Sequence, residues 1–134
     1  MANKRRKLSP DEKAHVYNKF NGHCAYCGCG TNLSDVTIDH VKPLNKNGTD
    51  ETDNMFPCCY VCNHIKHNFT VSKFRSRIIE ICHNINIDDI NIIPNDSVKP
   101  ERLSEIEIAK KYGNEVAVSG TVVFYYEKVV TKKL

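Results

Sequence analysis

Six of the seven cysteines in this 134-residue chain stand in two short groups. The groups are Cys24, Cys27 and Cys29, and Cys58, Cys59 and Cys62. Each contains a Cys-x-x-Cys pair, and two such pairs can place four thiolates at the corners of a tetrahedron, the geometry of structural Zn²⁺ sites. We therefore predict a structural zinc site with the ligands Cys24, Cys27, Cys59 and Cys62. Either Cys29 or Cys58 could replace one of these ligands, and four thiolates would leave the ion no open position for catalysis.

Four short motifs follow one another along the first half of the chain. They are CAYC (24–27), DHVKP (39–43), DN (53–54) and CYVCNHIK (59–66). Each alone is weak evidence, but in this order and at these separations, over roughly residues 20–68, they resemble the HNH nuclease family. That family folds as two β-strands and a helix around a catalytic metal ion. The resemblance implies an α+β protein with a ββα-metal core, and DNA as its substrate.

The resemblance also assigns roles to residues at matching positions. His40 would be the general base that takes a proton from the attacking water, a task that suits an imidazole with a pKa near its ordinary value of about 6.5. Asp39 and Asn63 would supply oxygen ligands to a catalytic divalent ion, Mg²⁺ or Mn²⁺. Asn54 would brace the loop and orient His40 without touching the substrate. The products would carry 5′-phosphate and 3′-hydroxyl ends.

The last position of the family pattern is often histidine, whereas this sequence has Asn63. An asparagine still offers a carbonyl oxygen to a metal ion. His64 and His67 lie on the same expected helix, so either could replace or join Asn63 as a ligand. Two histidine ligands would favour a softer ion such as Zn²⁺, Ni²⁺ or Mn²⁺ over Mg²⁺. We favour Asn63 with Mg²⁺.

The segments that would position these residues have clear local signals. Ser9-Pro10-Asp11-Glu12 is a capping box that predicts a helix running to about Phe20. The β-branched, alternating stretch over 36–41 predicts a strand, and 54–57 could form a short return strand. A helix is expected from near Cys59 to Lys66.

The second half of the chain carries fewer signals. A helix is expected from about Ser72, where that residue could be the N-cap. A second capping box at Ser104 predicts a short helix that Gly113 ends. The alternating stretch over 117–130, rich in Val, Phe and Tyr, predicts one or two C-terminal strands.

Composition and charge fit a soluble, intracellular protein that contacts a polyanion. Hydrophobic residues make up 40% and charged residues 26% of the chain, and no apolar run approaches the roughly 20 residues of a membrane span. Residues 1–77 carry 12 Lys and Arg against 7 Asp and Glu, whereas residues 78–134 carry 7 against 9. We predict no membrane contact and DNA contacts in the basic half. The candidate DNA-binding residues are Lys4, Arg5, Arg6, Lys7, Lys42 and Lys66.

We expect a single domain over 1–134. Within it, residues 1–8 would be a basic arm, 9–68 the zinc-stapled nuclease core and 69–134 a C-terminal helical and β extension. The main alternative to a nuclease is a zinc-knuckle module that binds nucleic acid without catalysis. A monomeric nickase and a homodimer that cuts both strands remain open at this point.

Overall fold

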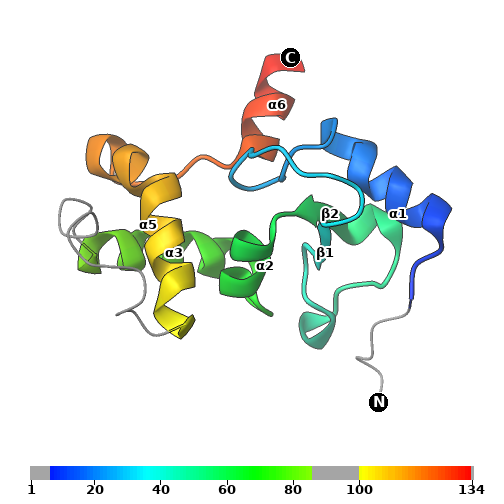
Figure 1. Cartoon of the computed structure of the whole chain (residues 1–134), viewed down its shortest axis with the longest axis horizontal. Coiled ribbons are helices and arrows are strands. Elements are labelled where there is room, and N and C mark those ends of the chain that lie inside the picture. Colours follow the sequence, from blue (N-terminus) through cyan, green and yellow to red (C-terminus); the bar gives the residue numbers. More distant parts are fainter. Residues whose placement is uncertain (1–6, 86–99, 134) are drawn as a thin grey trace. The chain divides into compact units, whose positions relative to one another are not determined.

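The computed structural model describes residues 7–85 and 100–133. The described elements begin with the helix α1 (Pro10–Tyr17), a 3₁₀ turn η1 (Asn18–Phe20) and the strand β1 (Thr37–His40). They continue with the 3₁₀ turns η2 (Leu44–Lys46) and η3 (Thr52–Asn54), the strand β2 (Met55–Cys58) and the helix α2 (Tyr60–Lys66). The helices α3 (Val71–Asn84), α5 (Pro100–Ser119) and α6 (Tyr125–Lys133) complete the set (Figure 1). The fold is therefore α+β, with several helices and a small two-stranded sheet.

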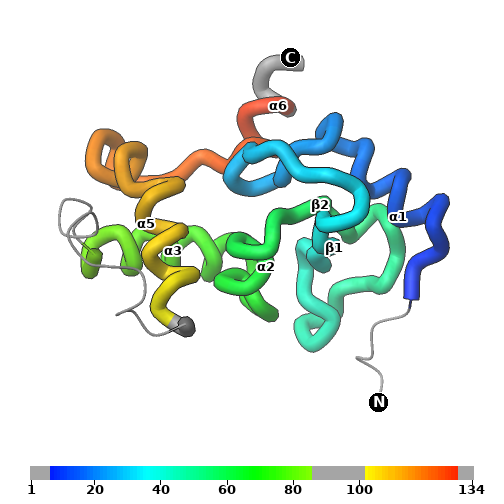
Figure 2. Tube along the Cα trace, in the orientation of Figure 1, coloured from blue at the N-terminus to red at the C-terminus, as the bar shows by residue number. Residues whose placement is uncertain are grey.

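The two strands pair antiparallel, with Thr37 opposite Cys58 and His40 opposite Met55. Pro57 lies opposite Ile38 and has no N–H to donate to the ladder, but its carbonyl oxygen accepts from the N–H of Ala25 at 2.9 Å. A long loop joins β1 to β2, as the chain path in Figure 2 shows. Directly after β2, Cys59 is the N-cap of α2. The expected order of strand, strand and helix is confirmed.

The first helix begins as the sequence predicts. The Ser9 Oγ accepts from the Glu12 N–H at 3.2 Å, and the Glu12 Oε1 accepts from the Ser9 N–H at 3.1 Å. This reciprocal pair satisfies two donors at the helix N-terminus that have no partner within the helix. Asn21 then adopts a left-handed conformation with φ of 53° and ends the following 3₁₀ turn.

The predicted C-terminal strands are wrong, because the described part of 117–130 is helical or irregular. α5 continues to Ser119, and α6 begins at Tyr125. The N–H groups of Tyr125 and Tyr126 donate to the carbonyl oxygens of Tyr26 and Ala25, at 2.9 and 2.8 Å. These tertiary bonds satisfy the first N–H groups of α6, and local β propensity does not prevent the helix from forming.

The predicted end of a helix at Gly113 is also wrong. α5 begins at Pro100, before Ser104, and passes through Gly113. Ile108, Ala109, Tyr112 and Val116 are buried on this helix, at the spacing of one helical face. Burial of that face offsets the cost of about 1 kcal/mol for a glycine within a helix.

Two compact units can be distinguished among the described residues. One comprises residues up to Val71 together with those from Val123 onward, and the other comprises Ser72–Val122. The second unit has its own apolar core, which includes Phe74, Ile78 and Ile81 of α3. The division into a core over 9–68 and an extension over 69–134 stays a prediction. Among the described residues, no helix is both long and apolar enough to span a membrane.

Candidate active site and metal centre

Four thiols converge where the start of α2 meets the turn after η1. The Sγ atoms of Cys24, Cys27, Cys59 and Cys62 all lie within 4.8 Å of one another, and those of Cys27 and Cys59 are 3.8 Å apart. Four sulfur donors at this separation suit one tetrahedral Zn²⁺ ion, in which sulfur lies about 2.3 Å from the metal. The four cysteines are therefore positioned to hold a metal ion.

The first cysteine pair is held by a tight turn. The N–H of Cys24 donates to the carbonyl of Cys29 at 2.8 Å, and the N–H of Gly28 donates to the carbonyl of Cys24 at 3.0 Å. Gly28 has φ of +80°, and a Cβ added there would lie 2.8 Å from the Tyr125 ring. Both the left-handed backbone and the close packing of α6 require glycine at this position.

The two additional thiols contact the cluster but lie outside the four-sulfur group. The pKa of the Cys24 thiol is lowered far below its ordinary value by hydrogen bonds with neighbouring thiols. The largest effect comes from Cys27, and smaller ones come from Cys29, Cys58 and Cys59. Burial raises the pKa of Cys58 well above the ordinary thiol value. The four-sulfur group in the structure therefore consists of the four cysteines that the sequence predicts.

Asp39 is held in a buried clamp at the end of β1. Its Oδ2 accepts from the Tyr26 hydroxyl at 2.6 Å, and the Lys66 Nζ lies 3.2 Å from Oδ1 and 3.1 Å from Oδ2. Burial raises the pKa of the Asp39 carboxyl, while the Lys66 charge and the Tyr26 hydrogen bond act in the opposite direction. Both clamping residues are close in sequence to cysteines of the four-sulfur group, so the thiol cluster and the carboxylate share one scaffold.

The predicted DNA contact at Lys66 is wrong. Its side chain is fully buried, and besides Asp39 its Nζ donates to the carbonyl oxygens of His40 at 3.1 Å and Val41 at 3.3 Å. A buried ammonium group with these partners has no access to a phosphate. Lys7 and Lys42 are exposed, whereas Lys4, Arg5 and Arg6 lie outside the described residues.

His40 follows Asp39 and is nearly buried, with 5% of its surface exposed. Its Nε2 lies 2.7 Å from the Oδ1 of Asp50, which belongs to the loop between β1 and β2. A carboxylate beside one imidazole nitrogen fixes the ring orientation and favours the tautomer with the proton on that nitrogen.

The Asn54 side chain bridges two parts of the same loop. Its Oδ1 accepts from the N–H of Lys42 at 2.9 Å, and its Nδ2 donates to the carbonyls of Lys42 and Thr49 at 2.9 and 2.8 Å. Gly48 closes the loop so tightly that an added Cβ would collide with the backbone of Lys42. These hydrogen bonds fix both ends of the loop that contains Asp50 and places it beside His40.

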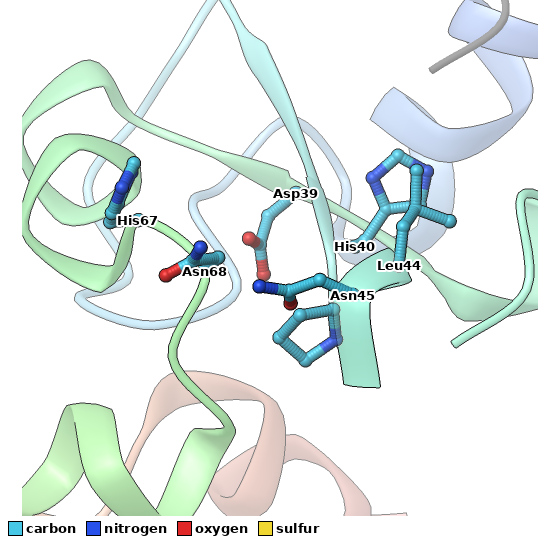
Figure 3. A pocket seen from close by; sticks show the side chains of 7 residues that line it. Asp39, His40, Leu44, Asn45, His67 and Asn68 are labelled. Atoms are coloured by element: carbon cyan, nitrogen blue, oxygen red, sulfur yellow. The ribbon is translucent and has the colours of Figure 1, made fainter. Parts of the chain in front are cut away.

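Asp39 and His40 line one hollow of about 300 Å³. The other lining residues are Pro43, Leu44, Asn45, His67 and Asn68. In Figure 3 the Asp39 carboxylate points into this hollow between Asn45 and Asn68, and the His40 ring lies beside Leu44. Because these two residues are adjacent on a strand, their side chains leave it in different directions. Both residues nevertheless line the hollow at the end of the strand.

Asn63 is not among the residues that line the hollow containing Asp39. It lines a second hollow of about 380 Å³ together with His40, and a third, shallower one with His67. His67 lines both the third hollow and the one that contains Asp39. At the end of α2, His67 has φ of 51° and ψ of −124°, a strained conformation for a residue other than glycine.

Comparison with known protein families identifies the segment that contains these residues. The model of the HNH endonuclease family matches residues 24–69, which include both cysteine pairs, Asp39, His40 and Asn63. This segment is an HNH domain. The match thus supports a nuclease-type function in general terms.

The wider comparisons add little to the HNH assignment. Among solved structures, the chain is similar to the Type II-C Cas9 enzyme from Actinomyces naeslundii, with 18% identity and a TM-score of 0.45. That similarity covers 80% of this chain and 13% of the Cas9 chain, so it bears on no activity here. No curated protein matches the sequence.

Two residues at the centre of the HNH domain are not among the sequence-based candidates. Tyr26 is an unspecified position within Cys-x-x-Cys, and Asp50 lies in a polar loop without periodicity. A tyrosine beside a cysteine ligand or an acid in a loop carries no local signal of its own. They are identified only by their hydrogen bonds in the folded protein. Tyr26 bonds Asp39, 13 positions away, and Asp50 bonds His40, 10 positions away.

Proposed function

We propose that this chain is a metal-dependent DNA endonuclease that hydrolyses phosphodiester bonds. The observation that carries the proposal is the placement of Asp39 and His40 in one hollow of the HNH domain, with His40 bonded to Asp50. This hydrolysis requires at least a carboxylate that holds a cation and an oriented imidazole that acts as the general base.

In this proposal His40 is the general base. The Nε2–H donates a hydrogen bond to Asp50, and Nδ1 takes a proton from the water whose oxygen attacks the phosphorus atom. As the new P–O bond forms, the bond from phosphorus to the 3′ oxygen breaks, and that oxygen takes a proton from solvent. The imidazolium that forms is then stabilised by the neighbouring Asp50 carboxylate, which retains its charge. Asn54 keeps the loop closed during this transfer. The expected products carry 5′-phosphate and 3′-hydroxyl ends, as in the family.

A catalytic ion would be held by Asp39, whose carboxylate lines the hollow. Each carboxylate oxygen has two lone-pair sites, so the carboxylate can ligate an ion while it also contacts the Lys66 ammonium. When bound, Mg²⁺ or Mn²⁺ would supply positive charge to the phosphate and the leaving oxygen. The second ligand would be either Asn63 of α2, as the resemblance implies, or His67, which directly follows α2 and lines the same hollow as Asp39. Loss of Mg²⁺-dependent cleavage in Asn63→Ala, but not in His67→Ala, would identify Asn63.

The thiol cluster would hold Zn²⁺ in a structural role. Its four sulfur atoms leave no open position, and ligation would stabilise the strands and helix that position Asp39. The exposed Lys7 and Lys42, together with the basic residues before them in sequence, would contact DNA phosphates and make binding salt-dependent.

The test uses supercoiled plasmid at low salt with Mg²⁺, with Mn²⁺ or with EDTA. Wild type is compared with His40→Ala and with His15→Ala, a control histidine that is exposed on α1. Zinc content and circular dichroism first establish that each variant is folded. We expect nicked or linear DNA that requires added metal, persists in His15→Ala and is absent in His40→Ala.

Other outcomes would favour different functions. DNA binding without cleavage under any metal would refute the nuclease and support a zinc-knuckle binding module. Cleavage that persists in His40→Ala would refute the assigned base. If nicked circles appear long before linear DNA, the active form cuts one strand at a time, as expected of a monomer.

A further inference from the structure

The outer face of α2 exposes an aromatic pair. Tyr60 is 65% exposed, and its ring stacks on the imidazole of His64 with centroids 5.6 Å apart and planes 12° from parallel. The two residues are four positions apart, so they lie on the same side of the helix. Of the exposed large hydrophobic side chains in the described part of the chain, which include Leu33 and Val118, Tyr60 is the aromatic one, and an aromatic face in solvent can stack on a nucleobase.

This pair is continuous with the proposed active site. Tyr60, Asn63, His64 and His67 together line a shallow hollow of about 270 Å³. His67 also lines the hollow that contains Asp39 and His40. A chain that lies across His67 from one hollow to the other would therefore contact both the proposed catalytic residues and the aromatic pair.

The surroundings of the pair suit a negatively charged strand. The sequence has no Asp or Glu between Asn54 and Ile79, so α2 carries no carboxylate that would repel a phosphate. The positive charge of Lys66 is paired with the buried carboxylate of Asp39. The exposed side of α2 therefore offers polar and aromatic groups without a strong positive charge, which favours contact with a base over a pure phosphate contact.

We propose that Tyr60 and His64 form a stacking platform for an unpaired nucleobase next to the scissile phosphate. A base within a duplex has both faces covered by its neighbours, and only an unstacked base can present its face to an aromatic side chain. The preferred substrate is then DNA that is single-stranded beside the cut. This inference rests on the proposed function, because it takes the nucleic acid bound at the active site as the occupant.

The platform is tested by binding measurements under conditions that prevent cleavage. Fluorescence anisotropy in EDTA-free buffer with Ca²⁺ compares one sequence as a single strand, as a full duplex and as a duplex with a short single-stranded gap. The variants are Tyr60→Ala, His64→Ala and the conservative Tyr60→Phe, with Leu33→Ala as an exposed apolar control. A 2-aminopurine base in the gap reports stacking directly through its fluorescence quenching.

We expect Tyr60→Ala to weaken binding of the single strand and the gapped duplex about tenfold, in the range of stacking one base on an aromatic ring. Binding of the full duplex should change less than twofold, and Tyr60→Phe and Leu33→Ala should behave as wild type. The 2-aminopurine quenching should be lost in Tyr60→Ala and kept in Tyr60→Phe.

The platform is refuted if Tyr60→Ala binds all three DNAs as wild type does, or if it weakens them equally. It is also refuted if wild type binds none of them, which would favour a protein partner for this face. Plasmid cleavage by wild type, measured separately, tests the proposed function. Preferential binding of gapped DNA that depends on Tyr60, without plasmid cleavage, would refute the nuclease and support the platform. Plasmid cleavage by wild type, with equal binding of all three DNAs by wild type and Tyr60→Ala, would support the nuclease and refute the platform.

Discussion

Replacing Lys66 by Met would remove the ammonium group that compensates the buried Asp39 carboxylate. Met is similar in length and volume, so the change leaves almost no cavity. The Lys66 side chain is fully buried and that of Asp39 is 3% exposed. Water reaches the carboxylate only at its small exposed edge in the hollow, so it replaces the lost ammonium group poorly, and the Tyr26 hydroxyl would remain as a donor to the carboxylate.

Two estimates of the cost agree. Removing one partner of a buried ion pair costs about 3–5 kcal/mol. The variant can instead protonate Asp39, which costs about 1.4 kcal/mol for each pH unit between the pKa and neutrality, or about 4 kcal/mol from an ordinary aspartate pKa of about 3.9. We therefore expect Lys66→Met to lose about 3–5 kcal/mol of unfolding free energy at pH 7.

The loss should depend on pH in a definite direction. Without Lys66, the pKa of Asp39 in the folded state rises further above its value in the unfolded chain. A raised carboxyl pKa penalises the folded state as the pH rises from the unfolded value through the folded one. The destabilisation of Lys66→Met relative to wild type should therefore be largest at neutral pH and shrink on acidification.

The assay is urea unfolding of zinc-loaded protein at pH 7 and pH 5.5, followed by circular dichroism. Asp39→Asn and the double variant Asp39→Asn/Lys66→Met complete a cycle that isolates the interaction between the two residues. The double variant should be more stable than Lys66→Met, because no buried charge remains. A loss below about 1 kcal/mol, equal at both pH values, would refute the buried pair and restore a solvent-facing role for Lys66.

Three further outcomes are expected from other parts of the site. Asp50→Asn should lower kcat by about tenfold to a hundredfold with little change in KM, because it disturbs the orientation and tautomer of the base; an equal loss in the exposed neighbour Glu51→Gln, measured by steady-state cleavage, would contradict this. Removal of zinc by a strong chelator, or Cys62→Ala, should abolish cooperative unfolding and near-UV circular dichroism, whereas an unchanged melting curve would rule out a structural metal. Asn54→Ala loses three hydrogen bonds of the loop and should lower the unfolding free energy by about 1–2 kcal/mol. Chemical denaturation measures this loss, and a change near zero would show that the loop closes without this side chain.

The sequence alone determined the chemistry-bearing motifs. Metal ligation requires particular residue types at short, fixed spacing, so the two Cys-x-x-Cys pairs predict a four-sulfur group that the structure assembles. The capping box of Ser9 and Glu12 is equally local, and its two hydrogen bonds form as predicted. The order of strand, strand and helix follows from the motifs in the same way, because each element is short and carries its own signal.

Tertiary structure alone decided which groups meet. Lys66 reaches Asp39 across 27 positions and is buried there, although its residue type suggested a phosphate contact. Asp50 meets His40 only because the loop closes on Asn54 and Gly48. α6 forms in place of the expected strands because carbonyl oxygens of the first cysteine turn accept the N–H groups at its start. In each case the deciding partner is distant in sequence, and local periodicity and propensity contain no information about a partner that only folding brings near.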